Sequence, residues 1–549
     1  MGEEFTMMHG RRKKRALAFM AAAVLAGSWP AGAGIGQAHA SGVPGIVEGN
    51  VHMASATAGT LTHAAKDVQI AAAKAQGQTP VARLVEETPV TAGAVHRRYV
   101  WNATRSGKEI RVKADVLVVD LANPYVELDL MIGRQGKVAT HNTVTNMAGE
   151  TGAVAGINGD VYNMNGQGAS IGGQIKGGVL VSTPTTLAGM YAFALTEDRR
   201  PVIDLFGFEG FVTKDGLSRY PLAGVNKAAS WIDGKHSHAD AIHLYTSDWG
   251  SKDRGNDGAT VPTEVLVQNN RGVQIAKDGV LDMLVPEDGY ILRASGKAAA
   301  YLTEWFKPGD FIFAEYKVTR AGDDTDTKYR MMIGGHTILV DGGQAIAFSR
   351  DISGVSGSAA RSRTAIGYSK DGRYVYLITA DKSADSDGMT LKELQSFMIA
   401  VGVWKGINLD GGGSTQMVAR PLGETSAVLV NELEQGVARR VVNGLGVYTT
   451  APVGNVLGLF VSGEDVYFIN ERAQLALKAY DEYFNPIVVD PSAIQWTSSD
   501  ETVAKFDGTY MTGMAPGSAT VTATSGNGIT ASAGVQVAGR ADLAELRIE

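Results

Sequence analysis

The sequence predicts a strand-rich α+β domain of mixed α/β character, followed by a small all-β sandwich. From about residue 97 to 450, β-rich runs alternate with turn signals. One segment, Thr390 to Gly402, has helical spacing instead. After Pro452 the pattern changes to that of short strands in which apolar and polar residues alternate. The 549 residues are enough for about three or four structural units.

The first expected elements are two strands, Arg111 to Leu121 and Val126 to Gly133, separated by the turn signal Asn123-Pro124. The only strong helix pattern starts at Thr390, a predicted N-cap with Glu393 at the third helical position, and continues as an apolar stripe to Val401. A second helix is expected around residues 142–148. Further strands are expected at residues 190–195, 241–245, 263–268, 311–318 and 374–379.

Composition excludes several classes of protein. The formal charge of -7 and the isoelectric point near 5.9 argue against a nucleic-acid binder, which usually has a basic face. The absence of cysteine excludes disulfides, thiolate zinc sites, cysteine nucleophiles and a lipid anchor on cysteine. The 68 glycines, about 12% against a usual 7%, indicate many tight turns and close backbone contacts.

The N-terminus has the three-part order of a secretory signal. Arg11 to Arg15 are basic, Ala16 to Trp29 are apolar, and small residues lead to Ala38-His39-Ala40, so residues 1–40 are predicted to be cleaved. The apolar stretch is short for an uncleaved anchor, which needs about 20 residues. No other transmembrane segment is expected. The mature protein is predicted to be secreted, with residues 41–96 as a linker or loosely ordered lead-in.

The C-terminal region, residues 453–538, resembles the bacterial immunoglobulin-like group 2 domains. The resemblance rests on "WTSSDETVAKFDG" followed by "TGMAPGSATVTAT", with Trp496 as the expected core aromatic. Such domains are spacers or wall-adhesion modules, so the resemblance implies contact with the cell wall. Residues 539–549 are interpreted as the start of a further module or a truncated tail.

Four segments of the central region present polar residues at strand ends: "AGINGDVY" from Ala155, "RSRTAIGYSKDG" from Arg361, "YLITADKSADSDG" ending a strand at Asp381, and "KGINLDGGGSTQMV" from Lys405. In the last, three consecutive glycines allow a sharp turn whose N–H groups can form an anion-binding nest. A nucleotide P-loop does not fit, because no Lys follows the glycines. Each string alone is also consistent with an ordinary turn.

Together and in this order, the segments resemble the phosphodiester glycosidase family, over about residues 97–450. "AGINGDVY", "RTAIG", "GMTLKELQSFMIAVGVWKGINLDGGGSTQMV" and the closing "RRVVNGLGVY" carry the resemblance. Asp381-Lys382 departs from it, since relatives commonly have Asp-Gly there. The resemblance implies a hydrolase that cleaves a sugar-1-phosphodiester, and we expect glycans of the cell wall or an exopolysaccharide as its targets.

The mechanism expected from these residues pairs two carboxylates with phosphate-binding groups. Asp410 and Asp160 are the predicted carboxylate pair, one of them base or nucleophile at the anomeric carbon. Arg363 is predicted to hold the phosphate. The remaining predicted substrate contacts are Asn158, Asn408, Gly411, Gly412, Gly413, Ser414, Asp381 and Thr364.

For several of these residues a purely structural role is an alternative. Arg363 is alternatively a buried partner of Asp410 or Asp381. Glu393 is better explained as a helix cap, Ser414 as a turn hydroxyl, and His336 as a structural histidine.

No cofactor is required by this mechanism, and no metal site is assigned. A structural calcium is an alternative at two acidic loops, one with Asp323, Asp324 and Asp326, the other with Asp381, Asp385 and Asp387. Two other functions compete with hydrolysis: a non-catalytic glycan-binding scaffold, and a transferase that passes the sugar to another acceptor. An open pocket shared by Asp160, Arg363 and Asp410 would favour catalysis.

Overall fold

The computed structural model describes residues 80–539, except 164–166, 215, 217, 233, 324 and 326. The signal sequence predicted at residues 1–40 and the tail after residue 539 therefore lie outside the described residues. Within the described part, no helix is long and apolar enough to cross a membrane.

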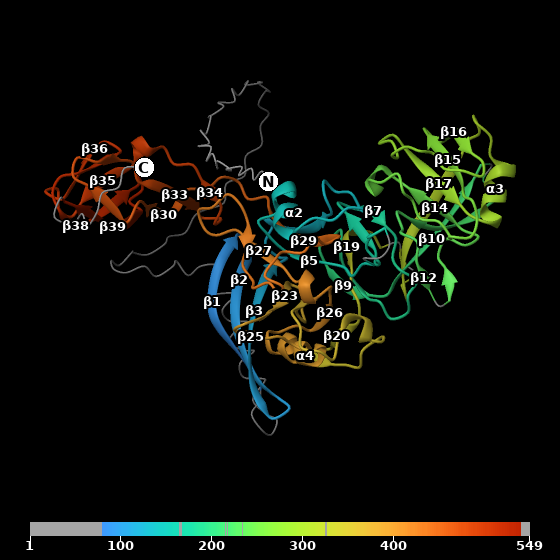
Figure 1. Cartoon of the computed structure of the whole chain (residues 1–549), viewed down its shortest axis with the longest axis horizontal. Helices are drawn as coiled ribbons and strands as arrows, with labels where there is room; N and C mark the ends of the chain where they lie inside the picture. The colour runs from blue at the N-terminus through green and yellow to red at the C-terminus, as the bar shows by residue number, and fades with distance from the viewer. Residues whose placement is uncertain are drawn as a thin grey trace, which may run out of the picture. The chain divides into compact units, whose positions relative to one another are not determined.

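The largest sheet has eight strands and carries most of the candidate site (Figure 1). Its order is β1 (Val81–Thr91), β2 (Ala94–Arg105), β3 (Lys108–Asp120), β23 (Tyr374–Ala380), β22 (Arg363–Tyr368), β26 (Lys405–Asn408), β20 (Ile338–Asp341) and β21 (Gln344–Ala345).

The lead-in expected at residues 41–96 is wrong for its last part, because β1 and the start of β2 occupy residues 81–96. β1 pairs antiparallel with β2, and its burial is largely confined to its end, where Val90 and Thr91 are covered. This edge strand was not predicted from the sequence, because its residues are largely polar and its apolar periodicity is weak.

Both faces of the eight-stranded sheet are buried, which explains the apolar run "VLVV" in β3. Val116 and Val118 face the side covered by α4 (Leu391–Ala400), and Leu117 and Val119 face the opposite side, toward the other sheets. The expected capping box of α4 is confirmed, since Thr390 accepts from the Glu393 amide and Glu393 accepts from the Thr390 amide. Phe397 packs edge-on against Tyr99, with ring centroids 5.8 Å apart.

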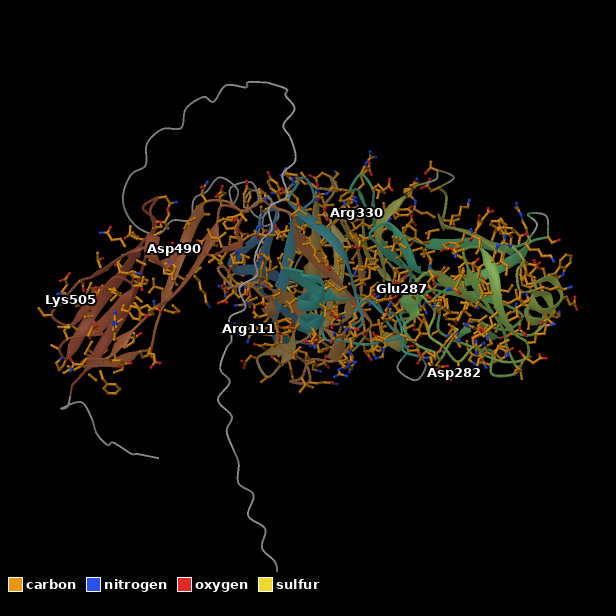
Figure 2. The ribbon with its side chains drawn as sticks, turned by 90° about the horizontal axis from the view of Figure 1, so that it is seen from above. Arg111, Asp282, Glu287, Arg330, Asp490 and Lys505 are labelled. Atoms are coloured by element: carbon orange, nitrogen blue, oxygen red, sulfur yellow. The ribbon has the colours of Figure 1, made fainter. Side chains whose placement is uncertain are left out.

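Two five-stranded sheets lie on the other side of this core. One has the order β28 (Val428–Leu429), β27 (Met417–Ala419), β5 (Ala155–Asn158), β29 (Asn443–Thr449) and β4 (Val126–Ile132). The other has the order β7 (Val179–Ser182), β6 (Gln174–Lys176), β19 (Tyr329–Gly334), β8 (Ala192–Thr196) and β9 (Pro201–Asp204). Arg330, labelled in Figure 2, links the two by an ion pair with Glu127, at 2.6 Å.

The second expected helix is present as α2 (Val144–Thr151), capped by Thr143, and it packs on the sheet that contains β5. All the strands expected from the sequence are present, with ends that differ by a few residues.

An insert, residues 206–320, forms a seven-stranded sheet with one helix, α3 (Lys297–Trp305). Its order is β16 (Arg271–Ala276), β15 (Thr263–Gln268), β17 (Gly289–Ala294), β14 (Ile242–Tyr245), β11 (Tyr220–Val225), β10 (Phe206–Thr213) and β18 (Phe313–Arg320). Phe206 pairs with Arg320, so the insert leaves and rejoins the chain at one point. Glu287, labelled in Figure 2, accepts from Lys137 of the main core at 3.3 Å.

The C-terminal region is all-β, as predicted, with three small sheets. Their strands are β30 (Val456–Ser462), β33 (Ala476–Asp481) and β34 (Pro486–Ile487); β31 (Val466–Phe468), β39 (Thr530–Ala538), β38 (Gly517–Thr524) and β35 (Gln495–Ser498); and β32 (Arg472–Ala473), β37 (Tyr510–Gly513) and β36 (Ala504–Asp507). Trp496 packs against the hydrophobic core of this C-terminal region and stacks on Phe506, with ring centroids 5.2 Å apart.

Candidate active site

The strand β26 delivers Asp410 to the edge of the core, beside the end of β5. The Asp410 amide donates to the Gly159 carbonyl at 2.9 Å, and the Asn158 side chain donates to the Asp410 carbonyl at 2.7 Å. The backbones of the "NGD" and "DGGGS" segments, about 250 residues apart, are therefore joined, as the sequence interpretation required.

The polar residues behind Asp410 hold this junction together. Asn158 accepts from the Thr364 hydroxyl at 2.8 Å, and Asn408 accepts from the Thr337 amide at 3.1 Å. Asn158, Thr364 and Asn408 are at most 2% exposed. The structure therefore does not support their predicted contacts with substrate. These buried side chains bind protein groups and hold the loops of the site in position.

Asp410 itself is partly exposed, with Ser414 and Arg439 beside it. Burial raises the pKa of Asp410 to about 6, while hydrogen bonds from Ser414 and the Gly411 amide and the charge of Arg439 counteract the rise. A carboxyl with this pKa is mainly ionised at neutral pH and can act as a base or nucleophile.

The glycines make room for two guanidinium groups. A Cβ atom on Gly413 would lie 2.6 Å from Nη2 of Arg439, and one on Gly412, whose φ is +60°, would lie 2.9 Å from Nη2 of Arg361. Any larger residue would displace these side chains. The triple glycine therefore reflects close approach of cationic side chains to the backbone.

Three of the four amides of the expected anion nest have acceptors within the protein. The Gly412 amide donates to the Ser362 carbonyl at 2.7 Å, the Ser414 amide donates to the Gly411 carbonyl at 3.2 Å, and the Gly411 amide donates to the Asp410 side chain. An anion at this place would meet Arg361 and Arg439 instead.

Arg361 and Arg439 are the functional candidates that sequence reasoning missed. Both are partly exposed. Arg361 forms an ion pair with Glu434, whose other oxygen accepts from the Ser362 amide at 2.9 Å. Arg439 donates to the Ser414 hydroxyl at 3.3 Å. Both stand at the start of the segments "RSRTAIG" and "RRVVNGLGVY", and only the fold shows that they reach the same loop.

Tyr162, two residues after Asp160, lies at the same site. Its hydroxyl donates to the Arg440 carbonyl at 3.2 Å, and its ring contacts that of His141, with centroids 5.2 Å apart. Burial and the negative charge of Asp410 raise the pKa of Tyr162, so the phenol stays protonated.

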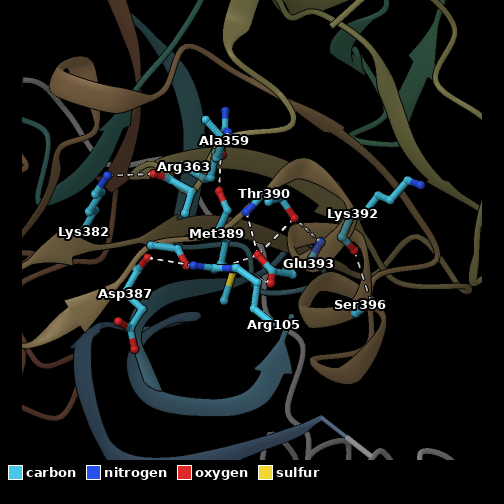
Figure 3. A network of polar contacts seen from close by, with 12 residues as sticks. Arg105, Ala359, Arg363, Lys382, Asp387, Met389, Thr390, Lys392, Glu393 and Ser396 are labelled. Atoms are coloured by element: carbon cyan, nitrogen blue, oxygen red, sulfur yellow. Dashed lines mark hydrogen bonds and ion pairs between the residues drawn. The ribbon is translucent and has the colours of Figure 1, made fainter. Parts of the chain in front are cut away.

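Arg363 does not face a phosphate site. Its side chain is buried and donates to four backbone carbonyls: Met389 at 2.8 Å, Val355 at 3.1 Å, Ser356 at 2.8 Å and Ala359 at 2.6 Å. Figure 3 shows Arg363 beside two of these residues, Met389 and Ala359. Arg363 also makes no ion pair with Asp410 or Asp381, so the alternative of a buried salt bridge is wrong as well. Arg363 is a structural residue that fixes the loop before β22.

The Glu393 side chain also has a structural role, as expected. It accepts from Arg105 at 2.8 Å as well as capping α4. His336 is buried, and burial lowers its pKa to about 4, so it is neutral at physiological pH.

Asp160 is 1% exposed, whereas Asp410 is partly exposed. The Oδ2 atom of Asp160 accepts from the Gly172 amide at 2.6 Å and lies against Gly334, while its Oδ1 has no hydrogen-bond partner among the described residues. Burial raises its pKa, and the charge of the buried Lys227 partly offsets the rise. The expected open pair of Asp160 and Asp410 therefore does not form, because Asp160 is enclosed by the protein.

Asp381 is equally buried. It accepts from the Asn431 side chain at 3.1 Å and from the Glu432 amide at 3.0 Å, so it anchors the segment that leads to Arg439 instead of lining the site. Asp387 accepts from the Arg111 amide, and Asp385 pairs with Lys113. Among the residues that the structure describes, no three acidic or histidine side chains gather as metal ligands. Asp324 and Asp326 of the other acidic loop lie outside them.

Fold and site together define a strand-rich α+β protein whose glycine loop brings a carboxylate to two guanidinium groups, a combination suited to sugar and phosphate chemistry. Residues 262–448 match the family described as phosphodiester glycosidase, and residues 468–535 match the bacterial Ig-like domain (group 2). These two stretches are therefore similar to a phosphodiester glycosidase domain and to a bacterial immunoglobulin-like domain, in the order that the resemblance implied. Comparison with curated protein sequences finds no match.

Two solved structures from bacteria are similar in fold to this chain. A "hypothetical protein from Synechocystis" has 18% identity and a TM-score of 0.53, over 68% of this chain and 65% of that chain. A "Putative exported protein" from Burkholderia pseudomallei has 16% identity and a TM-score of 0.56, over 68% and 97%. The catalytic domain of zebrafish N-acetylglucosamine-1-phosphodiester alpha-N-acetylglucosaminidase, auto-inhibited by its pro-peptide, has 15% identity and a TM-score of only 0.36, over 70% and 92%.

Proposed function

We propose that this chain is a secreted hydrolase that cleaves a sugar-1-phosphodiester, with Asp410 as its catalytic carboxylate. The observation that carries the proposal is the position of Asp410, partly exposed, on the loop that Arg361 and Arg439 approach. The family match over residues 262–448 supports the same reaction class.

In this proposal the two arginines bind the phosphodiester. Guanidinium groups are planar donors that remain charged at any physiological pH, and they can hold two phosphate oxygens at once. Within the described residues, the side-chain groups that hydrogen-bond Arg439 are neutral, Ser414 at 3.3 Å and Gln435 at 3.5 Å, so its charge remains available for substrate. This role replaces the one that the sequence assigned to Arg363.

Asp410 acts at the anomeric carbon, either by taking a proton from the attacking water or by attacking the carbon itself before water releases the sugar. The bond between the anomeric carbon and the phosphate oxygen breaks, and the phosphate monoester leaves with that oxygen. Because phosphate is a weak base, charge stabilisation by Arg361 and Arg439 matters more than proton donation.

The target is proposed to be a glycan of the bacterial cell envelope. The signal-like N-terminus supports export, and the immunoglobulin-like domain is of a bacterial extracellular type. Hydrolysis of purified wall polymers and exopolysaccharides, followed by mass analysis of the released sugar, would identify the target class.

The experiment compares Asp410→Asn with Asp385→Asn, a matched change at an acid whose side chain is 73% exposed. On chromogenic sugar-1-phosphodiesters, Asp410→Asn is expected to lower kcat/KM by at least about a thousandfold, while Asp385→Asn leaves it unchanged. Correct folding of both variants is checked by circular dichroism. If Asp410→Asn keeps most of the activity, Asp410 is not catalytic. Sugar transfer to an added acceptor in preference to water would instead define a transferase.

A further inference from the structure

Three phenylalanines lie on one face of the insert, outside its core. Phe211 of β10 and Phe313 of β18 are diagonal neighbours, because Phe211 pairs with Glu315 and Phe313 pairs with Thr213. Phe311 and Phe313 are stacked nearly parallel, with centroids 6.2 Å apart, and are 47% and 40% exposed. The alternate residues Val212 and Ile312 point the other way, into the core beneath α3.

Two guanidinium groups cover rings of this face. The Arg271 Cζ lies 3.8 Å from the ring centroid of Phe311, and the Arg219 Cζ lies 4.1 Å from that of Phe211. Both arginines are exposed, and neither forms an ion pair with another side chain of the described part of the chain. Phe211, Phe311, Phe313, Arg219 and Arg271 together are called the ring–guanidinium face.

The composition of this face suits a sugar polymer that carries phosphate. Glu315 pairs across the strands with Phe211 and is exposed, so that ring is bordered by a polar side chain. Aromatic rings suit the C–H faces of sugars, and guanidinium groups without carboxylate partners suit phosphate groups along a chain.

We propose that the ring–guanidinium face binds an anionic, phosphodiester-linked glycan chain and so retains the polymer that the Asp410 site cleaves. This inference rests on the proposed function for the identity of the polymer, but the binding itself needs no catalysis. The face is remote in sequence from every motif of the candidate active site, since it lies wholly between residues 211 and 313.

The test is affinity electrophoresis of the full chain in gels that contain either a purified polyol-phosphate wall polymer or neutral dextran. Two double variants are compared with the wild type: Phe311→Ala with Phe313→Ala, and Arg219→Gln with Arg271→Gln. Each is expected to weaken binding to the anionic polymer by about tenfold or more, since each removes two contacts. Phe468→Ala, at a ring of the C-terminal domain that is 50% exposed, is the matched control and should bind as the wild type does.

Hydrolysis of a small soluble sugar-1-phosphodiester separates this proposal from the proposed function. Both double variants should keep that activity and their thermal unfolding transition, whereas Asp410→Asn should lose the activity and keep polymer binding. The proposal is overturned if the wild type does not bind the anionic polymer, binds dextran equally well, or loses binding only in Phe468→Ala. Unchanged binding of both double variants would also overturn it.

Discussion

At the scale of single residues, the need for glycine at Gly412 and Gly413 is determined by side chains that are distant in sequence. "DGGGS" alone is compatible with a simple turn. In the structure, Arg361 and Arg439 lie so close to these glycines that a Cβ atom would collide with a guanidinium group. The requirement for glycine therefore comes from the groups that would hold the substrate.

Gly413→Ala tests this relationship directly. Gly413 has no left-handed backbone conformation, and the nearest atom to a new Cβ is the flexible end of Arg439, at 2.6 Å. The variant is expected to fold normally but to raise KM for a sugar-1-phosphodiester by about tenfold, because the displaced guanidinium loses one strong contact. Steady-state kinetics and a thermal melt check both parts.

Gly354→Ala is the control, since a Cβ atom there would meet nothing within 4 Å. An unchanged KM in Gly413→Ala would mean that the position of Arg439 does not matter for substrate binding.

The ionisation of Asp410 predicts the pH dependence of the reaction. Since its pKa is about 6 and the ionised form is the active one, kcat/KM should rise with pH up to about 6 and level off above it. Arg439 lowers this pKa by stabilising the carboxylate. Arg439→Gln should therefore move the acid limb to higher pH, and Arg439→Lys should largely restore its position. A profile that stays in place when Arg439 is neutralised would assign the limb to another group.

The sequence predicted which segments meet at the site but not where the side chains point. Asp160 follows a strand as Asp410 does, yet the following turn directs it into the interior, where Gly172 and Gly334 enclose it. Arg363 stands in a motif with Arg361, and only the latter reaches the glycine loop. A local pattern gives no direction to a side chain at the end of a strand, because the loops that surround it come from elsewhere in the chain.

At the scale of elements, the loops around the site are held by two arginines, the buried Arg363 and the partly exposed Arg105. Arg363 binds carbonyls of Val355, Ser356 and Ala359 from one loop and of Met389 from another, just before α4. Arg105 binds Glu393 and the Gly388 carbonyl at the same helix terminus. These contacts fix the start of β22 and of α4 (Figure 3). They therefore also support the position of the glycine loop.

Arg363→Met should therefore act on stability. It leaves four carbonyl oxygens without their donor and removes a buried side chain, which costs about 3 kcal/mol or more of the free energy of unfolding. Arg200→Met is the matched control, because Arg200 is 80% exposed and its ion pair with Asp198 is a surface pair that contributes little. Urea unfolding measures both. A large KM effect of Arg363→Met without loss of stability would restore Arg363 to the phosphate site.

Elements with a strong local signal were predicted, and those without one were missed. The capping box and apolar stripe of α4 are present as expected, because its terminus is fixed by its own side chains. α3 was missed because it begins at Gly296 without a side-chain cap. β1 was missed because most of its residues are exposed or half-buried. In both cases, tertiary contacts determine the element.

At the scale of the whole molecule, the insert and the C-terminal domain have different relations to the main core. Six large side chains of the insert belong to the main core: Tyr245, Trp249, Leu266, Leu281, Val285 and Ile291. The C-terminal clusters contain no residue before Val456, and the clusters of the main domain contain none after Tyr448. The insert, although it has its own sheet, is therefore part of the main folding unit.

Two deletions of the chain should consequently have opposite results. Removal of residues 206–320, rejoined by a short Gly-Ser linker at Leu205 and Ala321, takes those six side chains out of the main core. Each fully buried large apolar side chain contributes about 1.5–3 kcal/mol, so the loss of about 9–18 kcal/mol equals or exceeds the whole stability of a typical domain. The shortened chain should be unfolded or aggregated, although its ends are adjacent, since the Ala321 amide donates to the Leu205 carbonyl at 3.2 Å. Removal of residues 453–549 should instead leave a cooperative calorimetric transition and hydrolysis of a small substrate. If the chain without its insert unfolds cooperatively near the wild-type temperature, the insert is an independent domain and its six side chains are not needed by the core.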